Sequence, residues 1–126
     1  MFISVLLCTH DRPESLRRTL ESILCPSNLA VPEWELIVVR ETHCDRETAQ
    51  VCQEFSEKFP ERFRFLVHDS PGKSIKMNAA MESARGEILA MTDDDVLVAP
   101  DYLGAIRKVF GEHAADGAQG RILLDC

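Results

Sequence analysis

The amino-acid sequence predicts an α/β fold in three layers, with a mostly parallel sheet between helices on both faces. Two observations predict it. Short apolar runs rich in Ile, Val and Leu are typical of strands buried on both faces, and they alternate with longer segments of helical periodicity. The connections between them are short, as expected for right-handed strand–helix–strand crossovers. The 126 residues suffice for one domain with a core of its own.

The first predicted strand spans residues 2–8, and a helix follows it. Pro13 suits a first helical turn, and Asp11 with Glu14 three residues later is similar to a capping box. We expect this helix to end at Pro26. Its apolar residues share one face: Leu16, Leu20, Ile23 and Leu24.

Strands and helices continue to alternate along the rest of the chain. The later strands are predicted at residues 34–39, 63–67, 88–91 and 121–124, and the later helices at 47–59, at 73–84 and after Pro100. In parallel sheets, ligands bind outside the carboxyl ends of the strands. We therefore expect one crevice to be formed by residues 9–12, 40–45, 68–73 and 93–95.

Composition and charge argue against several classes of protein. Lys and Arg total 14 against 21 Asp and Glu, and a net charge of −7 disfavours binding to nucleic acid. Five cysteines without a Cys-x-x-Cys pair, and four scattered histidines, indicate neither a disulfide framework nor a zinc site. This cysteine usage suits a reducing, cytoplasmic compartment. The longest uncharged stretch, residues 22–32, falls short of the roughly 20 residues that a membrane span needs.

Three consecutive carboxylates, Asp93, Asp94 and Asp95, directly follow the predicted strand 88–91. Negative charges this close raise each other's pKa and destabilise the charged forms unless a cation lies among them. Carboxylate oxygens suit Mg²⁺ or Mn²⁺, and such a metal can also bind a diphosphate. The alternative interpretation is a solvated acidic turn in front of the next helix.

Gly72-Lys73-Ser74 stands between a predicted strand and a predicted helix, as a P-loop does. A P-loop also needs a glycine five positions before Gly72, where Val67 stands, so this motif is excluded. What remains is a helix start that carries Lys73 and Lys76. It could face a phosphate group, or the lysines could simply be solvated.

Several segments together resemble the family-two glycosyltransferases of the GT-A fold. Residues 2–13 resemble the opening strand and Thr-x-Asn-Arg turn of that family, and residues 35–39 its second strand. Gly72-Lys73-Ser74 with Asn78, residues 84–87, and residues 91–95 continued by 100–103 resemble its helix, its Ala-x-Gly-Glu turn and its Asp-x-Asp metal motif. The resemblance covers nearly the whole chain and implies a Rossmann-like GT-A fold.

The resemblance implies that residues 1–126 are the nucleotide-sugar-binding portion of an inverting enzyme. Such an enzyme transfers a sugar from a nucleoside-diphosphate sugar to a hydroxyl group of a glycan, lipid or other acceptor. It implies that Thr9 lies beside the nucleoside, that Glu41 accepts a hydrogen bond from the base, and that Asp93 faces the ribose or sugar. The implied donor-binding residues are Thr9, Arg12, Glu41, Lys73, Asn78, Asp93 and Asp94, and the implied ligands of Mn²⁺ or Mg²⁺ are Asp95 and Asp93.

The sequence also departs from the family's pattern. Arg40-Glu41-Thr42-His43 replaces the usual Asp-Asp-Gly-Ser, so the sequence does not determine which nucleotide base the protein binds. Asp11 replaces the usual Asn. The family's general base is expected beyond Cys126, so the sheet is expected to be truncated and the acceptor-binding part absent. A longer parent chain could place the enzyme at the inner membrane face. The alternatives are a noncatalytic nucleotide-binding module and, less favoured, a sugar nucleotidyltransferase.

Overall fold

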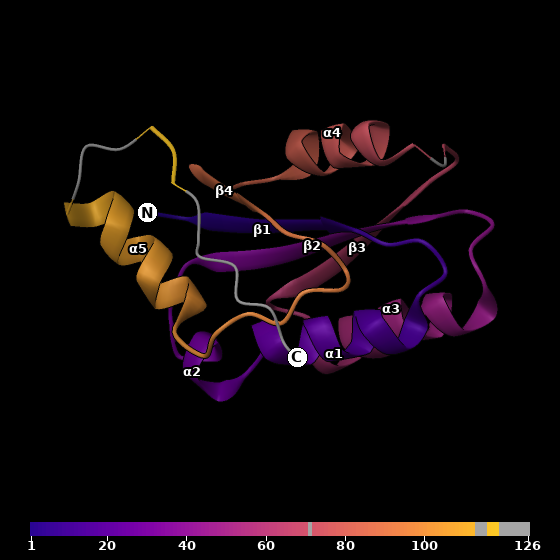
Figure 1. Cartoon of the computed structure of the whole chain (residues 1–126), viewed down its shortest axis with the longest axis horizontal. Coiled ribbons are helices and arrows are strands. Elements are labelled where there is room, and N and C mark those ends of the chain that lie inside the picture. Colours follow the sequence, from indigo (N-terminus) through magenta and orange to yellow (C-terminus); the bar gives the residue numbers. More distant parts are fainter. Residues whose placement is uncertain (71, 113–115, 119–126) are drawn as a thin grey trace.

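The computed structural model describes residues 1–70, 72–112 and 116–118. Its four-stranded sheet is parallel throughout, in the order β3-β2-β1-β4 (Figure 1). In chain order, the elements of this part of the chain are β1 (Ile3–Cys8), α1 (Pro13–Ile23), α2 (Pro26–Leu29), β2 (Trp34–Glu41), α3 (Arg46–Lys58), β3 (Phe63–His68), α4 (Lys73–Ser83), β4 (Ile88–Met91) and α5 (Tyr102–Glu112).

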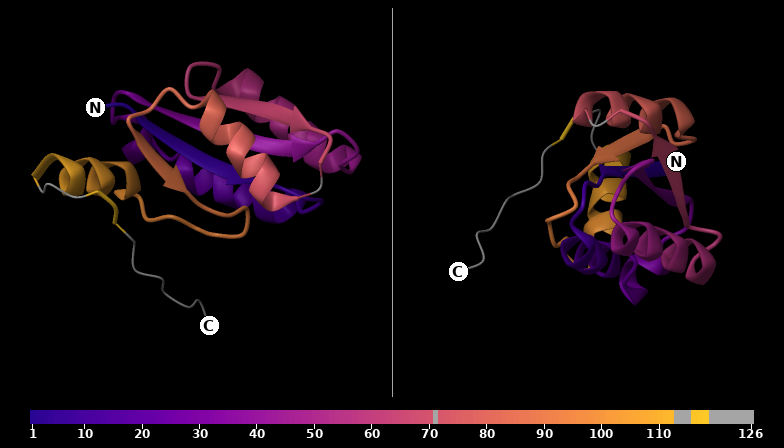
Figure 2. Two further views of the ribbon diagram at one scale, coloured as in Figure 1. Left: turned by 90° about the horizontal axis from the view of Figure 1, so that it is seen from above. Right: turned by 90° about the vertical axis from the view of Figure 1, so that its right-hand side faces the viewer.

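Helices cover both faces of the sheet, which confirms the predicted three-layer α/β fold. Figure 2 shows α4 alone on one face and α1, α3 and α5 on the other. On the face of α1, α3 and α5, alternate residues of β1 such as Val5 and Leu7 pack with Leu16, Phe55 and Leu103. On the face of α4, the core is smaller and consists of Leu6, Cys8, Ile37, Val39 and Ala80. The two central strands, β1 and β2, are buried on both faces, as their apolar sequences predict, whereas the edge strands β3 and β4 are only partly buried.

The predicted capping box at the start of α1 is wrong. Arg12 is the N-cap residue and makes no side-chain cap, although Pro13 does occupy the first turn as predicted. Asp11 adopts a left-handed backbone conformation with φ of 47°. Its carboxylate is therefore directed away from α1 and accepts a hydrogen bond from the backbone N–H of Asp45, 2.7 Å away, in front of α3.

Pro26 does not end α1, which stops at Ile23. Instead, Pro26 begins the short helix α2, because proline is tolerated where a first-turn N–H has no helical partner. Asn28 of α2 is buried. Its carbonyl accepts from the Trp34 indole at 3.0 Å, and its side chain accepts from the backbone N–H of Leu103 at 3.1 Å. These bonds attach α2 to β2 and α5.

Two strands extend further than their apolar patterns predict. β2 continues to Glu41 and β3 to His68, and these two residues are paired across the sheet. Glu41 thus belongs to the sheet and not to the loop after it. Helix α5 begins at Tyr102 and not at Pro100. The strand predicted at residues 121–124 lies outside the described residues, among which no helix has the length and apolar character to cross a membrane.

A buried carboxylate fixes the amino-terminal end of β4 to the sheet. Glu35 accepts hydrogen bonds from the Ser4 hydroxyl at 2.9 Å, the Arg64 Nε at 3.0 Å and the Arg85 backbone N–H at 2.8 Å. Burial would raise the pKa of Glu35, but these donors together hold it below its usual value. The turn between α4 and β4 also contacts β1 directly, since the Gly86 N–H donates to the Ser4 hydroxyl at 2.8 Å.

Candidate functional site

The order of the strands reverses beside β1, because β2 and β3 lie on one side of it and β4 on the other. Ligand sites of open α/β sheets form at such a switch point, outside the carboxyl ends of the strands. A pocket of about 350 Å³ lies there, between the loops that follow β1 and β4 and the start of α4. It is lined by Cys8, Thr9, His10, Arg12, Lys73, Lys76, Asp93, Asp94 and Asp95.

Asp94 holds the two loops of this pocket together. Its buried carboxylate accepts a hydrogen bond from the Thr9 hydroxyl at 2.9 Å and lies 3.5 Å from the Arg12 guanidinium. Its backbone carbonyl accepts from the Ser15 hydroxyl at 2.8 Å. Thr9 and Asp94 are 85 residues apart, so this bond joins the ends of β1 and β4. Both side chains are engaged within the protein.

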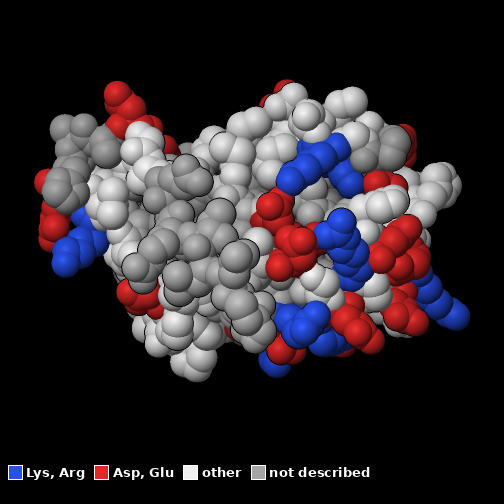
Figure 3. Space-filling view, in the orientation of Figure 1, with Lys and Arg blue, Asp and Glu red and all other residues white. Residues whose placement is uncertain are grey.

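Asp93 and Asp95 differ from Asp94 because their side chains are 50% and 54% exposed. Each carboxylate pairs with a cation from another element: Asp93 with Lys73 of α4, and Asp95 with Arg12 at 3.3 Å. The hydrogen bond and charge of Asp93 raise the pKa of Lys73. Figure 3 shows acidic and basic side chains next to one another in the right-hand half of that view, where β1 and β4 end. The protein itself thus supplies cations among its three carboxylates.

These carboxylates also have the chemistry that a magnesium or manganese ion requires. Mg²⁺ in proteins is commonly held by one or two carboxylates, substrate phosphates and water. Asp93 and Asp95 provide two such carboxylates, half exposed and on the pocket wall. Within the described ranges, no three His, Cys, Asp or Glu side chains gather in a way that could hold a metal. Two carboxylates are as many as Mg²⁺ commonly takes from a protein when phosphates and water supply its other ligands.

Glu41 and Lys76 form a buried ion pair behind the pocket. The Lys76 ammonium, 2% exposed as a residue, donates to the Glu41 carboxylate at 3.0 Å and to the Thr9 carbonyl at 3.3 Å. The His10 Nδ1 lies 2.8 Å from the same carboxylate oxygen. Burial would raise the pKa of Glu41, but Lys76 and His10 hold it below its usual value. Glu41 is thus kept as an anion.

The structure brings most of the predicted donor-binding residues together. Thr9, Arg12, Lys73 and the three consecutive aspartates line the pocket, and Glu41 lies directly behind His10. Asn78 is exposed on α4 and does not line this pocket. No binding role was predicted from the sequence for His10, which lies in the predicted crevice loop 9–12, or for Cys8, which directly precedes that loop. Lys76 was expected at a solvated or phosphate-facing helix start and is instead buried against Glu41.

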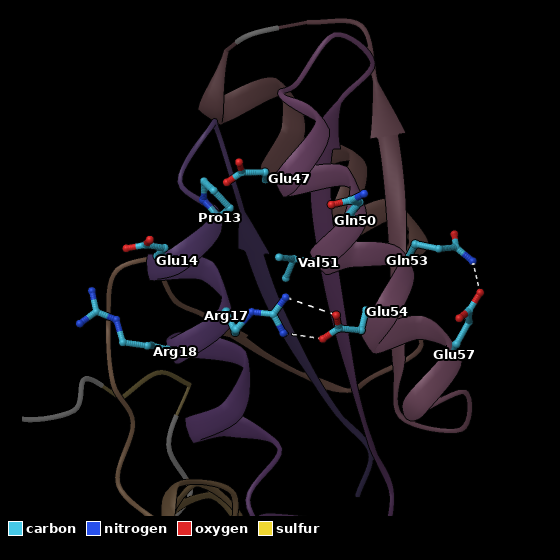
Figure 4. Close-up of a pocket in the computed structure, with 10 residues that line it drawn as sticks. All are labelled: Pro13, Glu14, Arg17, Arg18, Glu47, Gln50, Val51, Gln53, Glu54 and Glu57. Atoms are coloured by element: carbon cyan, nitrogen blue, oxygen red, sulfur yellow. Dashed lines mark hydrogen bonds and ion pairs between the residues drawn. The ribbon is translucent and has the colours of Figure 1, made fainter.

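A larger hollow of about 750 Å³ lies between α1 and α3, away from the strand ends (Figure 4). Arg17 and Glu54 point toward each other across it and form a two-bonded ion pair. The remaining side chains are mostly Glu and Gln of the outer helix faces, with no Ser, Thr, Cys, His or Lys among those that line the hollow. We therefore assign the functional site to the pocket at the switch point.

An all-parallel sheet with acidic loops and a basic helix start at its switch point defines an α/β protein with a site suited to a phosphate-containing ligand. A more specific assignment comes from comparison with known families. The family model "Glycosyl transferase family 2" matches residues 4–125. The chain therefore belongs to the family-2 glycosyltransferases.

Individual proteins and solved structures are also similar to this chain. The glycosyltransferase GlyA of Streptococcus pneumoniae is 26% identical over 118 residues, which are 94% of this chain and 16% of GlyA. The crystal structure of Staphylococcus aureus TarS 1-349 has a TM-score of 0.74 at 24% identity, over 99% of this chain and 39% of that one. A mannosyltransferase from Pyrobaculum calidifontis, in complex with GDP-Man and Mn²⁺, has a TM-score of 0.66 at 24% identity. This similarity covers 80% of this chain and 30% of the mannosyltransferase chain.

The structural similarities confirm the predicted GT-A fold. This chain spans less than half of the length of each of these relatives.

Proposed function

We propose that residues 1–126 bind the nucleoside-diphosphate sugar of an inverting glycosyltransferase whose acceptor is a hydroxyl group of a glycan, lipid or other molecule. The observation that carries this proposal is the joint placement of Thr9, Lys73 and the aspartates 93–95 in one pocket at the switch point. Family membership supports it. So does the similarly folded mannosyltransferase that holds GDP-Man and Mn²⁺. The cysteine usage supports a cytoplasmic location.

In this proposal, Asp95 and Asp93 hold a Mn²⁺ or Mg²⁺ ion. When bound, the ion would neutralise the charge that develops on the departing nucleoside diphosphate. Lys73 and Arg12 already lie at these two carboxylates, so their positive charges are close to where the diphosphate would bind. Asp94 positions the loop through Thr9 and does not need to contact the ligand.

The nucleoside end of the pocket is assigned to the side of β1 and β2. Thr9 follows β1, and Glu41 ends β2 as an anion that can accept a hydrogen bond from a base. One oxygen of Glu41 already contacts both Lys76 and His10, which leaves the other oxygen for a ligand. Asn78 remains a proposed donor-binding residue on the strength of the resemblance alone.

The test is calorimetric titration of the chain with UDP-glucose and with GDP-mannose, with Mn²⁺ and with a chelator. We expect Mn²⁺-dependent binding of one donor, abolished by Asp95→Asn. Asp101→Asn is the matched control, because Asp101 is an exposed aspartate nearby in sequence that does not line the pocket. Binding that survives both the chelator and Asp95→Asn would show that the assigned site is wrong.

A further inference from the structure

The ion pair between Lys73 and Asp93 occupies a carboxylate that the proposed function assigns to a divalent ion. Lys73 is the first residue of α4, and Asp93 follows β4, so the pair joins two elements at the pocket. Both side chains are at least half exposed, and among the described residues neither has a second ion-pair partner. A divalent ion and an ammonium that share one carboxylate repel each other. Binding of an ion to Asp93 therefore favours the release of Lys73.

The start of α4 explains why Lys73 has an anionic partner. The N-cap residue Gly72 makes no side-chain cap, and the first turn carries Lys73 and Lys76 and no acidic residue. The amino-terminal end of a helix is positive, so it disfavours these cations and favours an anion. Asp93 supplies that anion from another element. A phosphate group can take its place, because the free N–H groups of a helix start bind phosphates.

The other cations of the pocket wall are held more firmly than Lys73. Lys76 is 2% exposed and donates to the Glu41 carboxylate, so it has little freedom to turn toward a ligand. Arg12 contacts the buried Asp94 as well as the exposed aspartate that follows it, and keeps the first partner if a ligand takes the second. Lys73 has a 67% exposed side chain and a flexible four-carbon stem. It is therefore the lysine or arginine of the pocket that changes partner most readily.

We propose that Lys73 exchanges partners when the ion and the donor bind: its ammonium leaves Asp93 for a phosphate of the donor, and Asp93 holds the ion. This inference rests on the proposed function. Without the donor, Lys73 competes with the ion for Asp93, and with both bound it is a ligand of the diphosphate. The exchange makes the binding of ion and donor cooperative, because each of them takes one member of the ion pair and sets the other member free.

Lys73→Met tests the exchange because it removes the ammonium and keeps an unbranched side chain at an exposed position. An exposed ion pair changes an equilibrium constant by up to about fivefold. We therefore expect Mn²⁺ alone to bind about two- to fivefold more tightly to the variant, and the donor at saturating Mn²⁺ to bind about two- to fivefold more weakly. With a chelator, the donor affinity should stay within about twofold of the native value, since Lys73 then remains with Asp93 in the native chain.

The experiment is calorimetric titration of the native chain and the variant in three arms. The first arm uses Mn²⁺ alone, the second uses UDP-glucose or GDP-mannose with a chelator, and the third uses the same donors at saturating Mn²⁺. The electron paramagnetic resonance signal of free Mn²⁺ measures the affinity of the first arm independently. Lys108→Met is the matched control, because Lys108 is an exposed lysine of α5 that does not line the pocket, and its loss changes the net charge by the same amount.

We expect the two affinities to change in opposite directions in Lys73→Met and to stay unchanged in Lys108→Met. A loss of donor affinity that is equal with and without Mn²⁺ would show that Lys73 contacts the phosphates permanently, and would overturn the exchange. An unchanged Mn²⁺ affinity in Lys73→Met, or an equal gain in Lys108→Met, would overturn it as well. These three results leave the proposed function intact if the native chain binds a donor only with Mn²⁺. Absence of donor binding by the native chain in every arm would overturn both.

Discussion

Replacing Lys76 with methionine tests the buried ion pair behind the pocket. The substitution keeps the volume of the lysine stem and removes the charge that faces Glu41 at 3.0 Å. Lys76 and Glu41 are 2% and 8% exposed, so the carboxylate that remains has little access to water. Breaking a buried pair in this way typically costs about 3–5 kcal/mol. Since a native domain is stable by only about 5–15 kcal/mol, we expect a large loss in the free energy of unfolding.

The matched control is Lys73→Met, three residues earlier on α4. Lys73 also pairs with a carboxylate, that of Asp93, but its side chain is 67% exposed. Exposed pairs contribute at most about 1 kcal/mol. Urea denaturation of both variants at pH 7 makes the comparison. The double variant Lys76→Met with Glu41→Gln should recover part of the loss, because it leaves no unpaired charge.

The pH dependence of the free energy of unfolding tests the same ion pair in a second way. Lys76 and His10 hold the folded-state pKa of Glu41 below its ordinary value of 4.5. The pair therefore stabilises the fold above that pH and ceases to do so as the pH falls through the lowered pKa. The difference between the native chain and Lys76→Met should be largest at pH 7 and shrink in acid. A loss below about 1 kcal/mol at pH 7, equal to that of Lys73→Met, would refute the reasoning.

Two further predictions concern the amino-terminal end of β4. Gly86→Ala would place a Cβ 2.6 Å from the Ser4 backbone nitrogen, so it should destabilise by about 1–3 kcal/mol in urea denaturation. Gly104→Ala, in the first turn of α5 where no described atom lies within 4 Å of the added Cβ, should instead stabilise by at most about 0.5–1 kcal/mol. Equal effects would contradict the close approach. Glu35→Gln should cost roughly 1.5–3 kcal/mol at pH 7. Because Glu35 has a lowered pKa, this cost should diminish below pH 4.5, and a constant cost from pH 7 to pH 3 would contradict the charged state.

The sheet could be predicted from sequence because its strands contain short runs of apolar residues, and the two central strands β1 and β2 are buried on both faces. The predicted strand at residues 88–91 coincides with β4, although β4 is only partly buried. An apolar run does not show where a strand ends when the last residues of the strand are polar. Arg40 and Glu41 of β2 are charged, yet they pair with β3. Helix α4 begins at Lys73 as predicted, but the cap of α1 was predicted wrongly. Asp11 has the right residue type for a cap, but its backbone conformation directs it to α3.

The convergence of the site could also be predicted, since carboxyl ends of parallel strands meet at one edge. This rule placed Thr9, Arg12 and residues 93–95 together, and the pocket contains all of them. The rule also placed residues 40–45 and 68–70 at the crevice, and these do not line the pocket. The pairings inside the site could not be predicted. Lys73 and Lys76 are both lysines of the first turns of α4, yet one is exposed and the other buried. Which face of α4 meets the sheet decides this, and α4 has no strong apolar stripe to show it.

In the proposed site, the three consecutive aspartates divide structural and binding roles among themselves. β4 is a short strand, and bonds at both of its ends fix it to β1: Gly86 to Ser4 before it, and Asp94 to Thr9 after it. Asp94 can do this because its side chain is directed inward, which leaves its neighbours Asp93 and Asp95 directed to the pocket. An acidic triplet that served only as a solvated turn would not need a buried central member. The burial of Asp94 therefore favours a built site, in which one carboxylate holds the loop so that the other two keep their positions for a ligand.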